Sequence, residues 1–442
     1  MSTRNFKVVM LITIDCLRYD YSERYMRFTN AFFKRYGNIF ANVYTHGVGT
    51  PAAFPAILTS TYPLMYSMYP NLGRVRRTLA EVIKSLGFYT IGIASNPYLS
   101  RYFGYDRGFD LYFDYVPAKL LERLLLFTKT ASFVKLPVSK YTQLLSPYIR
   151  GYILVSLIEY LLNKLLKHSP TKRIFVWLHF MDLHAPLTPA LTLFAKRNIT
   201  LKEFSYSTLF TPLHVKLNMQ HGISDKFVKK LYVRALVEVD HYVEILIEIL
   251  ERLKVLEESL VIITSDHGEE LLENGIYGHP PIHSEHTLHV PLYAYPRIVD
   301  SSTYINSLKS LIDLAPSILN VLGFDNLLRT LPWYGESVLF SNVGRNFVIA
   351  ETGHTSMSND IKDAYLKFSI VNSNNIVTYK PFGNIIIVRN KDDNSIKVLC
   401  RIPECPSEVN QCIGIIRKHM KFEKKTQLLE RVRKLKQHLK VH

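Results

Sequence analysis

Cysteine is scarce in this chain of 442 residues, which contains only four. Cys16 stands alone, while Cys400, Cys405 and Cys412 lie close together near the end of the chain. Three sulfur ligands complete a tetrahedral zinc site only if another residue, such as histidine, supplies the fourth ligand. The role of this late group therefore stays open, and the low cysteine content fits a reducing compartment.

Long hydrophobic runs are also missing. The first seven residues are short and polar, and the apolar run that follows, 8–12, is too brief for the core of a signal peptide. The most apolar region, 152–166, is interrupted by Glu159, Asn163 and Lys164, so it falls short of the roughly 20 apolar residues that span a bilayer. We therefore expect a cytoplasmic protein.

Acidic residues are too few to balance the basic ones, with 37 Asp and Glu against 54 Lys and Arg. Much of the excess lies in 413–442, which we predict to be a basic amphipathic helix. Four apolar residues share one face of that helix: Leu428, Val432, Leu435 and Leu439. Such a face is typical of a helix in peripheral contact with a membrane surface, although it can equally dock on the protein's own core. We expect no specific binding of nucleic acid.

Short apolar runs alternate with longer helical patterns along most of the chain. Alternation of this kind is typical of an α/β fold, in which helices cover both faces of a mostly parallel sheet. The clearest buried strands are predicted at 8–14, 89–94, 174–178 and 260–264. Helices are predicted at 78–86, with Thr78 as N-cap, and at 225–255.

Three changes of pattern suggest how the chain is organised. A leucine-rich stretch and a proline-containing stretch interrupt the alternation within 116–224, and we interpret them as helical or irregular lid insertions. The catalytic domain that contains them covers 1–340. Short strands then dominate 341–412, which we predict to be a small C-terminal subdomain, and the basic helix follows at 413–442.

Chemically active side chains follow the ends of the predicted strands, where an open parallel sheet places its ligand site. Asp15 ends the first strand, and a carboxylate there is costly to bury without a cation, although Asp also suits a helix N-cap. Thr50 follows two glycines and precedes Pro51, so it lies at the start of a helix. There its hydroxyl, and any anion on it, would face free N–H groups and the helix dipole. A plain capping threonine would look the same.

Two more clusters follow later strands. His179, Asp182 and His184 follow the third strand, and such a set of His, Asp and His suits metal binding or protonation of a leaving group. Asp266 and His267 come directly after the fourth, and they offer oxygen and nitrogen ligands for a divalent cation. His279 lies shortly beyond them.

The order of these motifs resembles the sulfatase family of the alkaline-phosphatase superfamily. The resemblance covers roughly residues 6–355. It is carried by these segments in turn: Asp15 to Arg18, Thr50 to Thr59, Asp182-Leu183-His184-Ala185-Pro186 and Ser265-Asp266-His267-Gly268-Glu269. Further similar segments are 95–100, 107–110, 290–292 and 311–316.

The resemblance implies an alkaline-phosphatase-like fold and a hydrolase that uses one divalent cation, which could be Ca²⁺, Mg²⁺, Mn²⁺ or Zn²⁺. Carried over by position, the metal ligands are Asp15, Thr50, Asp266 and His267. Thr50 is then the nucleophile, and His184 and His279 contact the transferred group or protonate the leaving oxygen. Arg18, Asn96 and Asp182 are assigned to substrate binding. His354, with Asp182 and His184, could build a second metal site.

Three departures from the sulfatase pattern limit this transfer. Sulfatases convert a cysteine or serine to formylglycine, with an arginine four residues later, whereas Thr50 and Phe54 occupy those places here. Threonine cannot become that aldehyde. Cys16 replaces a second aspartate, which makes calcium less certain, and the lysine of a sulfate-binding stretch is absent at 94–97.

The substrate class is therefore open between sulfate and phosphate or phosphonate esters of a small molecule, glycan or lipid. Threonine nucleophiles occur in related phosphodiesterases, and a phosphothreonine needs only water attack to resolve, so the chemistry favours phosphorus. Two alternatives remain: a non-catalytic sulfatase-fold protein that binds an anion, and a phosphotransferase or mutase that uses the same Thr50.

Overall fold

The protein is described here by a computed structural model, which places residues 5–66, 71–116, 149–185, 187, 225–300, 303–353, 366–402, 405–406 and 409–439. The predicted lid insertions fall mostly outside these residues, and so does His354. The side chains from Leu428 onward also lie outside them, including the apolar face that was considered for membrane contact.

The first strand, β1 (Val8–Ile14), is buried along its whole length. Successive side chains of a strand point to opposite faces of its sheet. Accordingly, Val8, Met10 and Ile12 join one hydrophobic cluster, and Val9 and Leu11 join another. Both faces of the sheet are therefore covered, which is why this strand reads as a continuous apolar run.

The central sheet has nine strands in the order β10-β2-β9-β6-β1-β5-β3-β4, with β11 also paired to β2. Every pairing is parallel except those of β9, which runs antiparallel to both β2 and β6. The predicted mostly parallel α/β sheet is confirmed. Its other strands are β2 (Asn38–Tyr44), β3 (Tyr89–Ala94), β4 (Leu111–Phe113), β5 (Ile174–Phe180), β6 (Ser259–Ser265), β9 (His289–Tyr295), β10 (Tyr304–Ile305) and β11 (Lys309–Ser310).

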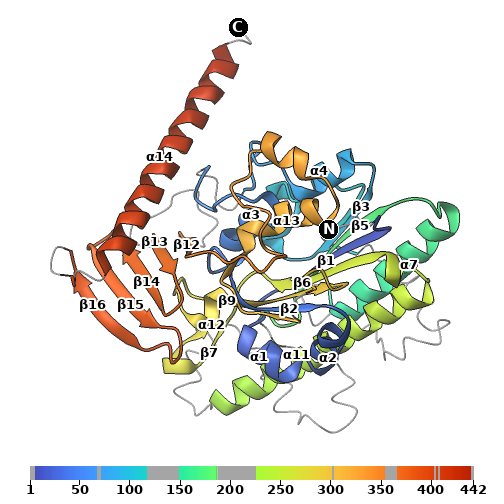
Figure 1. Cartoon of the computed structure of the whole chain (residues 1–442), viewed down its shortest axis with the longest axis horizontal. Helices are drawn as coiled ribbons and strands as arrows, with labels where there is room; N and C mark the ends of the chain where they lie inside the picture. The colour runs from blue at the N-terminus through green and yellow to red at the C-terminus, as the bar shows by residue number, and fades with distance from the viewer. Residues whose placement is uncertain are drawn as a thin grey trace.

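Helices lie on both sides of this sheet (Figure 1). One face is covered by α2 (Arg27–Tyr36), α7 (Gly151–His168) and α11 (Asp225–Arg252), with α1 (Tyr19–Tyr25) beside them. The other face is covered by α3 (Thr50–Thr59), α4 (Leu79–Ser85) and α13 (Leu314–Val321). Thr78 caps α4 in a capping box with Glu81, as its sequence predicts.

A second, antiparallel sheet follows the first. Its strands pair in chain order: β12 (Val348–Thr352), β13 (Lys367–Val371), β14 (Asn375–Lys380), β15 (Ile385–Asn390) and β16 (Ile396–Arg401). The predicted β-rich C-terminal part is confirmed. Between the two sheets lie a short two-stranded sheet, β7 (Glu270–Leu271) and β8 (Tyr277–Gly278), and the single turn α12 (Glu285–Leu288).

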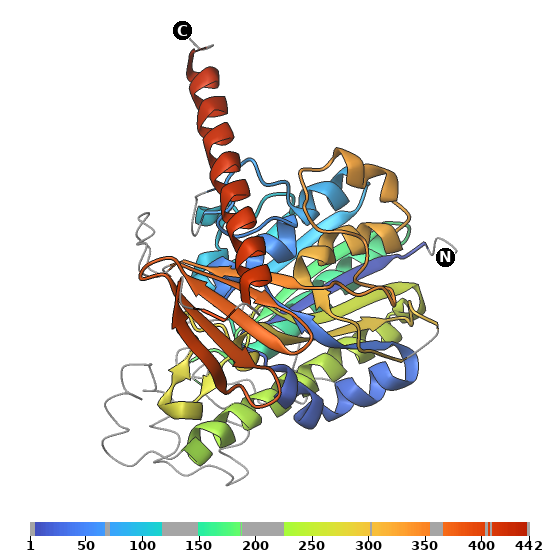
Figure 2. The same ribbon diagram turned by 60° about the vertical axis from the view of Figure 1, so that its left-hand side comes forward.

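The last helix, α14 (Asn410–Leu439), starts on this second sheet and then extends away from the body of the protein (Figures 1 and 2). Ile413, Ile416, His419 and Glu423 are buried at helical spacing. The beginning of the helix therefore docks on the protein's own core, whereas the apolar face predicted at 428–439 lies outside the described side chains. No helix in the described ranges is long and apolar enough to cross a membrane.

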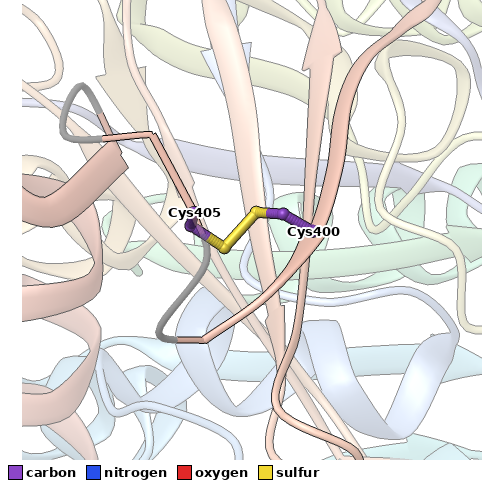
Figure 3. The surroundings of a disulfide bond; sticks show 2 residues. All are labelled: Cys400 and Cys405. Atoms are coloured by element: carbon purple, nitrogen blue, oxygen red, sulfur yellow. A yellow bond between two sulfur atoms is a disulfide. The ribbon is translucent and has the colours of Figure 1, made fainter.

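Two of the three late cysteines form a disulfide. Cys400, on the edge strand β16, is bonded to Cys405, with their Cα atoms 5.4 Å apart (Figure 3). Cys412 has a free thiol, as does Cys16. The late group is thus not a three-sulfur metal site, and a disulfide removes the support that cysteine content gave to a reducing compartment.

Candidate active site

The hydroxyl of Thr50 lies among buried polar groups at the first residue of α3. Gly49, with φ of 94°, is the N-cap, and the helix has no side-chain cap. Thr50 Oγ1 instead accepts a hydrogen bond from Asn96 Nδ2 at 2.9 Å and lies 3.4 Å from Asp15 Oδ2. The alternative of a capping threonine is therefore wrong, since the hydroxyl points at the carboxylate that ends β1.

The start of α3 also corrects one expectation. Pro51 has no N–H group, and the N–H groups of Ala52 and Ala53 both donate to Gly49 O, at 2.9 and 3.2 Å. The N–H groups of Ala52 and Ala53 are thus not free to bind an anion on Thr50. The helix dipole remains, and it favours negative charge on the hydroxyl oxygen.

Asp15 is fully buried and is held from several sides. Its Oδ2 atom accepts a hydrogen bond from Asn96 Nδ2 at 3.0 Å and lies 3.3 Å from His179 Nε2. His179 is oriented in turn by Thr13, whose Oγ1 lies 2.9 Å from Nδ1. When Thr13 donates to Nδ1, the Nε2–H group faces Asp15. Asn96 and His179 therefore fix the position of the carboxylate beside Thr50.

Asp266 and His267 present two unsatisfied atoms to the same place. His267 Nδ1 lies 2.8 Å from Gly268 O, so this nitrogen carries the proton and the Nε2 lone pair is bare. Asp266 Oδ2 and His267 Nε2 lie 3.5 Å apart, both residues are fully buried, and neither atom has a hydrogen-bond partner in the described structure. His267 Nε2 also lies 3.7 Å from Asp15 Oδ1.

The pKa values of the two carboxyl groups are shifted in opposite directions. Burial raises the pKa of Asp15, but the hydrogen bond of His179 and the charges of His184 and His267 outweigh it and hold that pKa well below its usual range. Burial and the charge of Asp15 raise the pKa of Asp266 well above its usual range. Because the two carboxyl groups lie so close, ionisation of one disfavours ionisation of the other, and a divalent cation would allow both to be ionised.

These residues fit a divalent cation. Buried donors are normally satisfied, so an orphaned carboxylate oxygen and an orphaned imidazole nitrogen that face a second carboxylate form an incomplete ligand set. Asp15, Asp266 and His267 would hold the ion, and Thr50 would face it. Sequence reasoning named these four residues, and the structure brings them together.

His279 and His184 lie beside this ligand set. The ring centroids of His279 and His267 are 4.6 Å apart, and those of His279 and His184 are 5.2 Å apart. Burial lowers the pKa of His279, but the charge of Glu269 and its hydrogen bond to Nδ1, at 3.1 Å, raise it above its ordinary value. Both histidines thus lie near the cation site, and their role in proton transfer stays a prediction.

Arg18 is engaged elsewhere. Its guanidinium forms ion pairs with Asp20 at 2.7 Å and Glu273 at 3.0 Å and donates to Glu269 O. With its charge compensated there, the predicted role in substrate binding has no support in these contacts. Arg18 instead joins β1 to the loop after β6.

Asp182 is also held by structural contacts. Its Oδ1 accepts a hydrogen bond from Gly151 N, at the start of α7, and lies 3.5 Å from Arg150 Nε. Its Oδ2 is buried without a hydrogen-bond partner among the described residues. Burial outweighs Arg150 and raises the pKa of this carboxyl. Its described contacts therefore secure α7 rather than Thr50.

The second sheet supports the loop before Thr50. Val48 N donates to Thr352 Oγ1 at 3.0 Å, and Thr352 Oγ1 lies 2.8 Å from His283 Nε2. His283 Nδ1 reaches Ser369 Oγ at 2.6 Å. Gly47 is pressed against β12 so closely that a Cβ atom would stand 2.6 Å from Glu351 O. The C-terminal sheet thus anchors both the Thr50 loop and the segment after His279.

A family model named Sulfatase matches residues 7–324 of the chain. The chain belongs to the sulfatase family. Arylsulfatase K of Mus musculus is 30% identical to this sulfatase-family protein over 121 residues. That match covers 27% of this chain and only 22% of the mouse protein.

Solved structures share the fold. The phosphonate monoester hydrolase of Agrobacterium radiobacter matches with a TM-score of 0.65 at 14% identity, over 95% of this chain and 96% of the other. BT4656, solved in complex with D-glucosamine-2-N,6-O-disulfate, matches with a TM-score of 0.63 at 12% identity, over 96% and 98%. The sulfatase-family protein therefore shares the fold of these proteins along nearly all its length.

Sequence reasoning grouped His179 with Asp182 and His184 without placing it beside Asp15, and it gave Glu269 no role. His179 lies inside β5 and pairs in register with Thr13 of β1, so a strand alignment of 8–14 with 174–180 would have placed it beside Asp15. Glu269, which orients His279, stands three residues after Asp266 in a quoted motif, but nothing local indicates its partner.

Proposed function

We propose that the protein is a divalent-cation-dependent hydrolase of phosphate or phosphonate esters, with Thr50 as its nucleophile. The observation that carries this proposal is the position of Thr50 Oγ1. It lies 2.9 Å from Asn96 Nδ2 and 3.4 Å from Asp15 Oδ2, and Asp15 Oδ1 in turn lies 3.7 Å from the orphaned Nε2 atom of His267.

Each neighbour has a role that follows from its geometry. The amide of Asn96 donates to both Thr50 and Asp15, so it fixes the direction of the hydroxyl. When bound, the cation polarises the ester oxygens and lowers the pKa of the Thr50 hydroxyl. In this proposal, His279 and the neighbouring His184 donate a proton to the leaving oxygen, and Glu269 supports the role of His279 because it raises that residue's pKa.

The choice of phosphorus over sulfur rests on the nucleophile. A threonine cannot form the aldehyde hydrate through which sulfatases release sulfate, whereas a phosphothreonine is resolved by attack of water. The likeness to a phosphonate monoester hydrolase along 95% of the chain supports this choice. The likeness to a protein solved with a glucosamine disulfate keeps sulfate esters in the test.

The test is turnover of matched p-nitrophenyl esters: sulfate, phosphate monoester, phosphate diester and methylphosphonate, each with Mg²⁺, Mn²⁺, Ca²⁺ or Zn²⁺. We expect a phosphorus ester to turn over, and Thr50→Ala to lower kcat by roughly 10³-fold or more. Thr50→Ser keeps the oxygen and serves as the matched control that should retain activity. Quenched reactions should show a phosphoryl mass increment on the peptide that contains Thr50.

Each other outcome counts against the proposal. Turnover of the sulfate ester alone would show that the protein hydrolyses the family's usual substrate although it has a threonine at position 50. Undiminished turnover in Thr50→Ala would show that Thr50 is not the nucleophile. Phosphorylation of Thr50 without release of phosphate would indicate transfer to another acceptor rather than hydrolysis.

A further inference from the structure

Cys16 has an unusual backbone conformation beside the cation site. Its φ is 61°, in the left-handed region that residues other than glycine rarely adopt. Tyr232 holds it there, because its hydroxyl donates to Cys16 O at 2.7 Å and accepts from Arg18 N at 3.1 Å. Leu17 N donates to Ser265 Oγ at 3.0 Å, which fixes the turn from its other side.

This conformation directs the thiol at the ligand set. Cys16 Sγ lies 3.0 Å from Asp15 Oδ1 and 3.7 Å from His279 Nδ1, and Cys16 is fully buried. Cys16, His267 and His279 each offer one ligand atom, and these three atoms lie within 4.8 Å of one another. Bonds of 2.3 Å to sulfur and about 2.05 Å to nitrogen at a tetrahedral zinc put those atoms ~3.5 Å apart.

A second observation points to a ligand at this place. His267 Nε2 is fully buried, carries a bare lone pair and has no hydrogen-bond partner in the described structure. The cation that Asp15, Asp266 and His267 would hold satisfies that nitrogen, and Cys16 Sγ lies within 4.8 Å of a ring nitrogen of His267. A cation reached by sulfur, imidazole and carboxylate together would satisfy all three.

We infer that Cys16 is a ligand of the active-site cation, and that its sulfur makes the site selective for zinc or a similar thiophilic transition ion over calcium and magnesium. This inference rests on the proposed cation site and deepens it. Calcium and magnesium take oxygen ligands, whereas thiolate and imidazole select zinc and its neighbours. On binding, the S–H bond breaks, its electron pair forms the bond to the ion, and the proton leaves to solvent.

The test uses the full chain, freed of metal with a chelator and then loaded with Co²⁺. A thiolate ligand adds a sulfur-to-cobalt charge-transfer band in the near ultraviolet to the visible bands of the bound ion. We expect that band in wild type and in Cys412→Ser, the matched control at the other free thiol, and not in Cys16→Ser. The ratio of Zn²⁺ to Ca²⁺ affinity, measured by calorimetry, should fall by about tenfold or more in Cys16→Asp.

Several outcomes would overturn the inference. Visible bands of bound cobalt without the charge-transfer band in wild type would show that Cys16 is not a ligand, while the cation site itself survives. A charge-transfer band that persists in Cys16→Ser would say the same. If no Co²⁺ binds at all, as metal analysis would show, then the proposed cation site fails together with this inference.

A measurement on wild type alone guards against a Cys16 variant that does not fold. Cadmium is thiophilic like zinc, and the ¹¹³Cd resonance of the loaded protein moves strongly downfield when a thiolate is bound. A resonance in the range of purely oxygen and nitrogen ligands would refute sulfur ligation without any substitution.

Discussion

The hydroxyl of Thr352, on the first strand of the C-terminal sheet, accepts a hydrogen bond of 3.0 Å from the backbone N–H of Val48, two residues before Thr50. Thr352 is fully buried. We expect Thr352→Val, which keeps the shape and removes the acceptor, to lower the free energy of unfolding by about 1–3 kcal/mol. It should also lower kcat, because the loop that carries Thr50 loses an anchor. Urea unfolding and steady-state kinetics measure the two effects.

Thr29→Val is the matched control for that experiment. Thr29 is buried in α2, on the face of the central sheet opposite α3, and its Oγ1 donates to Asp240 Oδ1 at 2.6 Å. It should cost stability while leaving kcat close to wild type. Equal losses of kcat in both variants would contradict a specific role for the Val48 bond.

Arg18 offers a test of a structural role against a substrate-binding one. Its ion pairs with Asp20 and Glu273 predict that Arg18→Met lowers the free energy of unfolding by about 1–3 kcal/mol. KM should stay within about twofold of wild type for an anionic ester, since the guanidinium faces those carboxylates. A large rise in KM with unchanged stability would restore the substrate-binding assignment.

His279 is expected to protonate the leaving group. His279→Gln should slow esters of poorly acidic alcohols by about 10²–10³-fold and p-nitrophenyl esters much less, because p-nitrophenolate leaves without a proton. His286→Gln is the control, since His286 pairs with Glu270 at 3.0 Å much as His279 pairs with Glu269 at 3.1 Å. A uniform slowing of all esters by His279→Gln would argue for a structural or ligand role instead.

Stability should fall on the acid side of neutrality because of buried neutral histidines. Burial, together with neighbouring positive charges, lowers the pKa of both His46 and His283 to about 3, from an ordinary value of 6.5. A depressed pKa contributes stability above pH 6.5 that is lost as the pH falls towards 3, because only the unfolded chain binds the protons. The loss is at most about 1.4 kcal/mol per pH unit for each histidine.

Comparison of variants isolates this effect from the titration of carboxylates in the same range. His283→Gln should flatten the dependence of the free energy of unfolding on pH between 6.5 and 4. His168→Gln, at an exposed position, should leave it unchanged. The unfolding curves are measured with a chelator present, so that loss of a cation does not contribute.

Exposed basic residues on α14 predict binding to anionic membranes. Arg417, Lys418, Lys421, Lys424 and Lys425 are exposed, on a helix that extends from the body (Figure 2). We expect the protein to sediment with vesicles rich in phosphatidylserine and to be released by about 0.5 M salt. Replacing Lys421, Lys424 and Lys425 with Gln should weaken binding roughly 100-fold, at about 1 kcal/mol per charge.

The control for this replacement lies on the opposite part of the fold. Lys164 and Lys167, at the end of α7, and Lys172, just after it, are also exposed, and their replacement with Gln should have little effect. Binding that survives 0.5 M salt, or that is lost equally in both variants, would refute an electrostatic role of α14.

The sequence predicted those parts of the fold in which a single strand or helix carries its own signal. The strand 8–14 is apolar throughout because both its faces are covered, and it was placed with correct ends. The direction of β9 carries no such signal, because a buried strand reads the same in either direction. The partners of Asp15 were only partly predicted, since His179 reaches it across the sheet rather than along the chain.

The spacing of the late cysteines in the sequence also did not predict which two of them form the disulfide. Cys400, Cys405 and Cys412 permit three pairings, and the choice depends on where β16 ends relative to the start of α14. The separation of 5.4 Å between the Cα atoms of Cys400 and Cys405 settles it. Arg18 illustrates a different limit. The motif located this residue in the chain but did not predict the direction of its side chain.

The contact between β12 and the loop before Thr50 has a practical consequence for the choice of an expression fragment. The family model ends at residue 324, which invites an expression fragment that stops near that boundary. Such a fragment would lack Thr352 and Glu351, and so would lose the acceptor for Val48 N and the strand against which Gly47 is pressed. The fragment would contain all the catalytic motifs, but it would lack the sheet that anchors the loop before Thr50. The shortest piece of this protein worth cloning therefore includes the whole C-terminal sheet.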